Sequence, residues 1–300
     1  MDRKIAIQLR NNEPWVELCG MMHRAGFKYV AMSFGDDEGH LLSDNWREYV
    51  EDMARIFAEN DLKCIMTHAP YYSLWISAEQ RDEKMELSML RAIEATKILG
   101  AEICAVHPRS FLIPGVSPAE SCDRDRSFKE NLISFKPLVK ACEEFGVKLG
   151  IENLMRYPDP QFPHFYSYIV EDQIELIDSL ASDSVCGVWD FGHANLCDED
   201  HSERIRKLGS RIMGTHVHNN DAVNDNHYPP FYPSPASYYV RRSVDWNAVM
   251  AALKDTGFDG YLTLEVVFHF GYSTEALIKY LYDCLCTLDE MLKKITANSN

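Results

Sequence analysis

Short β-rich runs alternate along the whole chain with longer segments of helical periodicity. The runs predict strands at residues 5–9, 29–34, 63–68, 101–107, 147–153, 185–190, 212–218 and 261–267. The segments between them predict helices at residues 15–25, 44–59, 78–99, 127–145, 168–180, 203–208, 245–255 and 274–294. Helical segments that end on glycine, such as those before Gly26 and Gly146, suit the left-handed residue that closes many helices. The chain therefore repeats a strand–helix unit eight times.

Eight strand–helix units without a run of hairpins predict an α/β fold with an all-parallel sheet. Eight is the number that closes into a (β/α)8 TIM barrel, and 300 residues suit one such domain spanning residues 1–300. An open, doubly wound sheet is the alternative. The segment QLRNNEPW at the end of the first strand, however, lacks the GxGxxG turn of dinucleotide-binding folds. We therefore expect a barrel.

The overall charge argues against a polyanionic partner. Lys and Arg total 30 against 46 Asp and Glu, which gives a formal net charge of −16. Because phosphate neutralisation supplies most non-specific affinity for nucleic acids, we do not expect nucleic acid as a partner. The hydrophobic share of 46% is that of an ordinary globular protein.

The sequence predicts a cytoplasmic protein that does not enter a membrane. The N-terminal segment MDRKIAIQLR lacks the apolar stretch of a secretory signal, and no run reaches eighteen apolar residues. The nine cysteines form no CxxC pair, so reduced thiols are expected.

Acidic and imidazole side chains stand at the ends of the third to eighth predicted strands. The carboxyl ends of barrel strands converge on one face, so these residues are expected around one small volume. Ionisable side chains seldom lie on buried strands unless they are paired or bind a metal. The residues are His68, His107, Glu152, Asp190, His193, His216 and Glu265, with Asp225 and His227 in the loop after the seventh strand.

Six of these residues also have a purely structural interpretation. Glu152 and Glu265 would serve as partners of a cation such as Arg156. Asp190 with His193 would cap the helix that follows. His68 and His107, both close before a proline, would hydrogen-bond their turns. His218 lies two residues after His216 on the same strand, and we expect His216 to be the ligand and His218 to support it.

The segments IENL, WDFGHANL, HVHNNDAVNDNHYPP and LTLE together resemble the xylose isomerase-like barrel superfamily. That superfamily contains sugar-phosphate isomerases and epimerases, inosose dehydratases and endonuclease IV. The resemblance covers nearly the whole chain. It implies a metal-dependent enzyme that isomerises or epimerises a sugar, sugar phosphate or polyol by abstracting a proton next to a carbonyl, and it implies a homo-oligomer.

The resemblance also implies roles for individual residues. The divalent metal, zinc or manganese with magnesium and cobalt as alternatives, is held by Glu152, Asp190, His216 and Glu265. Glu152 and Glu265 are in addition the catalytic acid and base. His193, His68 and His107 are placed at the substrate.

Endonuclease IV provides the main rival interpretation. Its trinuclear zinc set is similar to the same four ligands together with His68, His107, His193, Asp225 and His227, and clustered metals suit phosphodiester hydrolysis. The net charge and the segment QLRNNEPWVELCG depart from that branch. The ketose 3-epimerases have a further acidic residue where Pro158 and Asp159 stand here, so the sequence departs from them as well. An inosose-type dehydratase and a sugar-sensing barrel without activity are the remaining alternatives.

Overall fold

A computed structural model describes residues 3–10, 14–35, 38–71, 75–76, 83–232, 241–266 and 274–294. Within these residues eight parallel strands close into a barrel in the order β1, β10, β9, β8, β7, β5, β3, β2. This confirms the predicted (β/α)8 barrel. The strands are β1 (Ile5–Arg10), β2 (Tyr29–Ser33), β3 (Lys63–His68), β5 (Ile103–Val106), β7 (Lys148–Glu152), β8 (Val185–Asp190), β9 (Ile212–Val217) and β10 (Tyr261–Leu264).

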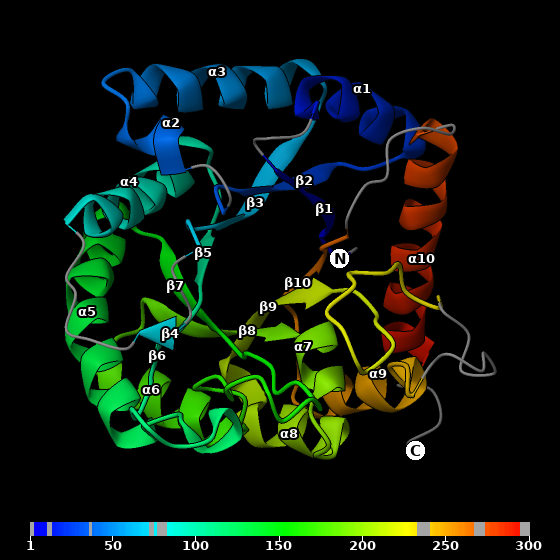
Figure 1. Ribbon diagram of the computed structural model, residues 1–300. Helices are drawn as coiled ribbons and strands as arrows, with labels where there is room; N and C mark the ends of the chain where they lie inside the picture. The colour runs from blue at the N-terminus through cyan, green and yellow to red at the C-terminus, as the bar shows by residue number, and fades with distance from the viewer. Residues whose placement is uncertain are drawn as a thin grey trace.

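Helices surround the strands, as Figure 1 shows in a view along the barrel. Neighbouring helices pack in chain order, and α10 closes the ring against α1. The helices of the described residues are α1 (Trp15–Ala25), α2 (Glu38–Leu42), α3 (Trp46–Glu59), α4 (Glu83–Ile98), α5 (Arg124–Phe145), α6 (Val170–Leu180), α7 (Phe191–Leu196), α8 (His201–Leu208), α9 (Trp246–Asp255) and α10 (Thr274–Lys294), with 3-10 turns at Pro118–Glu120 and Gly209–Arg211.

The two-residue period of the strands divides the core into two parts. On β1, Ile7 and Leu9 pack in the layer between strands and helices. Ala6 instead faces the lumen, where it belongs to a separate cluster with Ile103 and Val188. The same alternation continues to the C-terminal end of the barrel, so every second residue there points into the lumen.

Most differences from the expected elements lie at their ends. The helix α9 begins at Trp246 because Asp245 is its N-cap and accepts a hydrogen bond from Ala248 N. The expected strand residue 267 and helix residues 78–82 lie outside the described residues. A two-stranded sheet of β4 (Trp75–Ile76) and β6 (Ser110–Phe111) was not expected. Its strands come from the loops after β3 and β5, so it adds a layer beside the barrel mouth.

Two further sequence expectations concern the thiols and the membrane. All nine cysteines are free, and seven of them are buried. In the described part of the chain, no helix has the length and apolar character needed to cross a membrane.

Candidate metal centre

Three groups of possible metal-binding side chains lie at the C-terminal mouth of the barrel. In each group one donor atom per residue lies within 4.8 Å of all the others. The structure thus brings together all nine residues expected from the sequence and adds His218. We name them the central cluster (Glu152, Asp190, His216, Glu265), the His68 cluster (His68, His107, Glu152) and the His193 cluster (His193, His218, Asp225, His227).

The central cluster gathers residues from four adjacent strand ends, β7 to β10. His216 Nδ1 lies 3.0 Å from Glu152 Oε2, 3.2 Å from Glu265 Oε2 and 3.9 Å from Asp190 Oδ2. All four side chains are buried. Three carboxylates and one imidazole therefore converge on a volume closed to bulk solvent, where their charges need compensation.

The His68 cluster shares Glu152 with the central cluster. Its two imidazoles both approach Glu152 Oε2, His68 Nε2 at 3.2 Å and His107 Nε2 at 3.4 Å. The two rings meet edge to face with their centroids 4.6 Å apart. Because Glu152 belongs to both clusters, it joins them into one continuous set of donors.

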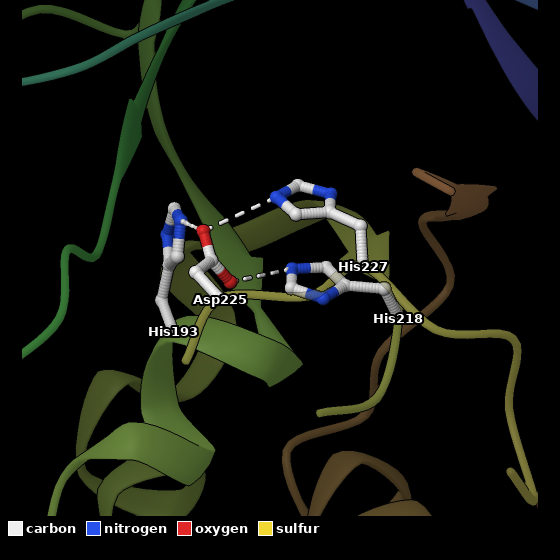
Figure 2. Close-up of side chains that lie close together, drawn as sticks. All are labelled: His193, His218, Asp225 and His227. Carbon is white, nitrogen blue, oxygen red and sulfur yellow. Dashed lines mark hydrogen bonds and ion pairs between the residues drawn. The ribbon is translucent and has the colours of Figure 1, made fainter. Parts of the chain in front are cut away.

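In the His193 cluster, the Asp225 carboxylate faces three imidazole rings (Figure 2). Its Oδ2 lies 3.2 Å from His227 Nε2 and 3.4 Å from His193 Nε2. A backbone bridge between Asn219 and Tyr228 folds the loop after β9 back on itself. That fold returns Asp225 and His227 to the mouth of the barrel.

Backbone carbonyls fix the tautomers of three of these histidines. His68, His193 and His227 each donate a hydrogen bond from Nδ1 to a main-chain oxygen. In the neutral ring this leaves the lone pair on Nε2, which faces the carboxylates of the clusters. Histidines that bind metals are oriented by this kind of hydrogen bond. The carbonyl acceptors are, in the same order, those of Ala69, Asn153 and Glu265, at 2.7, 2.9 and 3.0 Å.

Several buried donor atoms of the clusters have no hydrogen-bond partner among the described residues. They include Glu152 Oε1, Asp225 Oδ1 and both ring nitrogens of His216. Two ligands of one tetrahedral cation, with bonds of about 2.1 Å, lie roughly 3.4 Å apart. The separations of 3.0 and 3.2 Å around His216 Nδ1 are close to that value. The residues therefore fit a divalent cation that accepts mixed nitrogen and oxygen ligands.

The imidazoles and carboxylates strongly shift one another's pKa values. Burial acts to raise the pKa of Glu265, but His216 and His227 outweigh it and lower the pKa to about 2. Burial likewise acts to raise the pKa of Glu152, which His216 and His107 hold well below its ordinary value. The pKa of His216 is lowered by burial but rises to about 9 beside Glu152 and Glu265. Both glutamates are therefore ionised at neutral pH.

The purely structural interpretations are partly wrong and partly correct. Arg156 does not pair with either glutamate; it lies 3.1 Å from Asp198 and 3.7 Å from Glu199. Asp190 does cap a helix, because its Oδ1 accepts a 2.6 Å hydrogen bond from His193 N at the start of α7. Since Asp190 also belongs to the central cluster, capping and cluster membership coexist in one side chain.

His218 belongs to the His193 cluster and also contacts the central cluster. Its Nε2 lies 3.0 and 3.1 Å from the two carboxylate oxygens of Asp190. Its ring stacks on that of His227, with centroids 3.9 Å apart and planes inclined by 4°. His218 thus contacts a carboxylate of the central cluster from within the His193 cluster, and the supporting role expected of it stays a prediction.

Sequence reasoning missed Tyr71, which follows Pro70 in the loop after β3. Tyr71 Oη lies 3.4 Å from Glu265 Oε1 and 3.5 Å from Ser33 Oγ. Its ring stacks on His107 with centroids 5.4 Å apart. The signal was the position of Tyr71 three residues after His68, in a loop on the same face of the barrel.

Solved structures with the same fold include enzymes that act on sugars. An L-ribulose 3-epimerase superposes with a TM-score of 0.71 at 15% identity, over 99% of this chain and 98% of that one. A D-tagatose 3-epimerase-like protein gives a TM-score of 0.69 at 19% identity, over 97% and 98%. At these identities the likeness concerns the fold.

Two relatives found by sequence have a higher identity to this chain than these solved structures, but each match covers a smaller part of it. An uncharacterised protein of Methanocaldococcus jannaschii is 26% identical over 67% of this chain and 64% of its own length. A D-psicose 3-epimerase of Enterocloster bolteae is 26% identical over 64% of this chain and 56% of its own length. The chain thus spans less than two thirds of the length of these relatives.

The sequence profile described as "Xylose isomerase-like TIM barrel" matches residues 21–285, which include every residue of the three clusters. The barrel topology and the convergence of the strand-end residues agree with that match. The chain belongs to the xylose isomerase-like TIM barrel family.

Proposed function

We propose that the protein catalyses the reversible isomerisation or epimerisation of a sugar, sugar phosphate or polyol. One observation carries the proposal: the carboxylates of Glu152 and Glu265, from strand ends on either side of β8 and β9, both approach His216 Nδ1, at 3.0 and 3.2 Å. Two bases thus flank one small volume, as proton transfer on two sides of a carbon requires. The names of the D-psicose and L-ribulose 3-epimerases support a sugar as the substrate class.

The central cluster is proposed to hold one divalent cation, zinc or manganese, through Glu152, Asp190, His216 and Glu265. When bound, such a cation polarises a carbonyl group and stabilises the negative charge that develops when the neighbouring C–H bond loses its proton. Magnesium and cobalt are the alternatives.

The protein's own residues transfer the proton. Glu152 and Glu265 are ionised because neighbouring imidazoles lower the pKa of each. One carboxylate takes the proton from the carbon next to the carbonyl and becomes a carboxylic acid. In an isomerisation this acid returns its proton to the neighbouring carbon; in an epimerisation the other glutamate first takes up a proton from solvent and then delivers it from its own side, while the first releases its proton to solvent. Tyr71 Oη, 3.4 Å from Glu265 Oε1, orients that carboxylate.

Solvent deuterium exchange tests the proposal. The zinc- and manganese-loaded protein is incubated in D₂O with a panel of ketoses, sugar phosphates and inososes, and NMR follows the C–H next to the carbonyl. We expect exchange in at least one compound, and a loss of about 100-fold or more in Glu265→Gln. Absence of exchange throughout the panel contradicts the proposal. Binding without exchange favours a sugar-sensing barrel, whereas exchange followed by loss of a neighbouring hydroxyl identifies a dehydratase.

Phosphodiester hydrolysis is a second candidate, favoured by one observation. Glu152 joins the central and His68 clusters, and His193 Nδ1 lies 3.2 Å from Glu152 Oε1, so the three clusters are contiguous. Neighbouring cations in such an arrangement suit the attack on a phosphodiester. Robust incision of abasic-site DNA at low salt by zinc-loaded protein would place this candidate first. The net charge of −16 counts against it.

A further inference from the structure

The lumen beside Glu265 contains a buried amide that the proposed reaction does not use. Gln8 lies on β1, is 2% exposed, and neither its Nε2 nor its Oε1 has a hydrogen-bond partner among the described residues. Buried polar groups are nearly always satisfied, so an amide with both groups free needs an explanation. A donor and an acceptor without partners in one side chain indicate a bound group that both accepts and donates a hydrogen bond.

The strand alternation places the Gln8 side chain in the lumen. Ala6, two residues earlier, belongs to the lumen cluster, whereas Ile7 and Leu9 pack toward the helices. Residues i and i+2 of a strand face the same side. Gln8 therefore points inward, one layer nearer to the mouth than Ala6.

The strand register places Gln8 at the height of the candidate base. Ala6 pairs with Thr263 and Ile7 with Leu264 in the parallel ladder between β1 and β10. Gln8 and Glu265 each follow this last pair directly along the chain. On its other side Gln8 pairs with Ala31, which has a small side chain. The amide is thus next to the volume in which Glu265 would meet a substrate.

The side chains around Gln8 indicate which kind of ligand group it binds. Thr263, one layer deeper, is fully buried and its Oγ1 also has no partner among the described residues. The ladder neighbours of Gln8 and Thr263 on this side, Ala31 and Ala6, are uncharged. A hydroxyl group both donates and accepts a hydrogen bond, so it matches the amide of Gln8, which offers one group of each kind.

We infer that Gln8 binds a hydroxyl group of the ligand and thereby selects a polyhydroxylated substrate. This inference rests on the sugar or polyol substrate class of the proposed function. Gln8 touches the substrate and takes no part in proton transfer. Thr263, the ladder partner of Ala6 and of His216, lies two residues before Glu265 and serves as the comparison residue.

The test compares Gln8→Met, which keeps the length of the side chain but removes both hydrogen-bonding groups, with Thr263→Val as the matched control. Isothermal titration calorimetry measures binding of D-psicose, D-tagatose, L-ribulose and myo-inositol to the zinc-loaded protein. We expect Gln8→Met to weaken binding about tenfold or more at unchanged metal content. Thr263→Val should stay within about twofold of the wild-type protein.

A second readout separates ligand binding from a structural role. Removal of an unsatisfied buried amide should leave the Tm of the ligand-free protein unchanged or raise it. Unchanged binding in Gln8→Met, a lowered Tm in that variant, or a wild-type protein that binds none of the four compounds would each overturn the inference. Binding without deuterium exchange would instead remove the proposed reaction and leave the role of Gln8 intact.

Discussion

The ring of Tyr71 occupies the space in which a side chain at residue 35 would begin. A Cβ added to Gly35 would lie 2.0 Å from Tyr71 Cε2 and 2.3 Å from Cζ. The backbone holds the contact, because Tyr71 N donates to Gly35 O at 3.0 Å. Gly35 in turn donates from its N to Ser33 Oγ at 3.1 Å. The absence of a side chain at Gly35 therefore allows Tyr71 to reach Glu265.

Gly35→Ala should displace the Tyr71 ring without touching any candidate ligand. We expect the rate of deuterium exchange to fall about tenfold or more, and the free energy of unfolding to fall by roughly 1–3 kcal/mol through overpacking. Gly20→Ala is the control, since its added Cβ would meet nothing closer than 3.4 Å. Wild-type exchange rates in Gly35→Ala would show that the position of Tyr71 does not matter.

Tyr71→Phe should separate the hydroxyl from the ring. The variant loses the contacts with Glu265 and Ser33 but retains the stacking on His107. We expect kcat to fall about tenfold with little change in KM, because the lost hydrogen bond orients a base rather than binding the ground state. Tyr71→Leu should lose more activity than Tyr71→Phe, because its side chain no longer stacks on His107. Equal activities of the Phe variant and the wild-type protein would remove the hydroxyl from the mechanism.

Glu152→Gln should reduce metal content more than Asp225→Asn does. Glu152 belongs to two clusters and Asp225 to one. Elemental analysis of zinc-loaded protein after gel filtration measures the difference. Asp172→Asn is the control, because Asp172 is a buried carboxylate that pairs with Arg124 outside the clusters. Wild-type metal content in Glu152→Gln would contradict the assignment of Glu152 as a ligand.

Chelation of the cation should destabilise the protein. Without a cation, Glu152, Asp190 and Glu265 remain buried close to one another. A ligand present at 100 times its Kd stabilises the folded state by about 2.7 kcal/mol. Thermal unfolding with and without EDTA measures the effect, and we expect a decrease in Tm of several degrees. Glu152→Gln should respond less, and an equal response would indicate that EDTA acts elsewhere.

Stability should fall as the pH falls because of His201. Burial lowers the pKa of His201 well below its ordinary value, and Arg204 and Arg242 lower it further. Its Nε2 accepts a 2.9 Å hydrogen bond from Trp189 Nε1, which the protonated ring is unable to do. The unfolded chain binds a proton below about pH 6.5 while the folded protein does not. Stability due to the neutral ring is therefore present above that pH and is lost below it.

His201→Gln measures this contribution, because glutamine keeps an acceptor for Trp189 but does not titrate. The difference in free energy of unfolding between the wild-type protein and the variant should decrease from pH 7.5 to pH 5.5, with a slope of at most about 1.4 kcal/mol per pH unit. A difference that is independent of pH would show that His201 is not the titrating group.

The sequence by itself determined the barrel and the place of the seven residues expected at strand ends. The eight strand–helix repeats imply parallel strands, and the carboxyl ends of parallel strands meet at one mouth. Residues as distant along the chain as His68 and Glu265 therefore had to approach one another, whatever the loops between them do. The contact between Asp190 and His193 could also be predicted from the sequence, because both residues lie at one strand–helix junction.

Only the tertiary structure decided which atoms of these residues meet. That Glu152 is shared by two clusters depends on the rotamers of side chains from several strands. The contact of Tyr71 with Glu265 and the close approach to Gly35 join three loops and strands that have no local relation in sequence. That the Gln8 amide has no hydrogen-bond partner in the described part of the chain becomes evident only from the positions of the side chains around it. Such contacts depend on packing between distant segments, and the periodicity of the sequence carries no information about that packing.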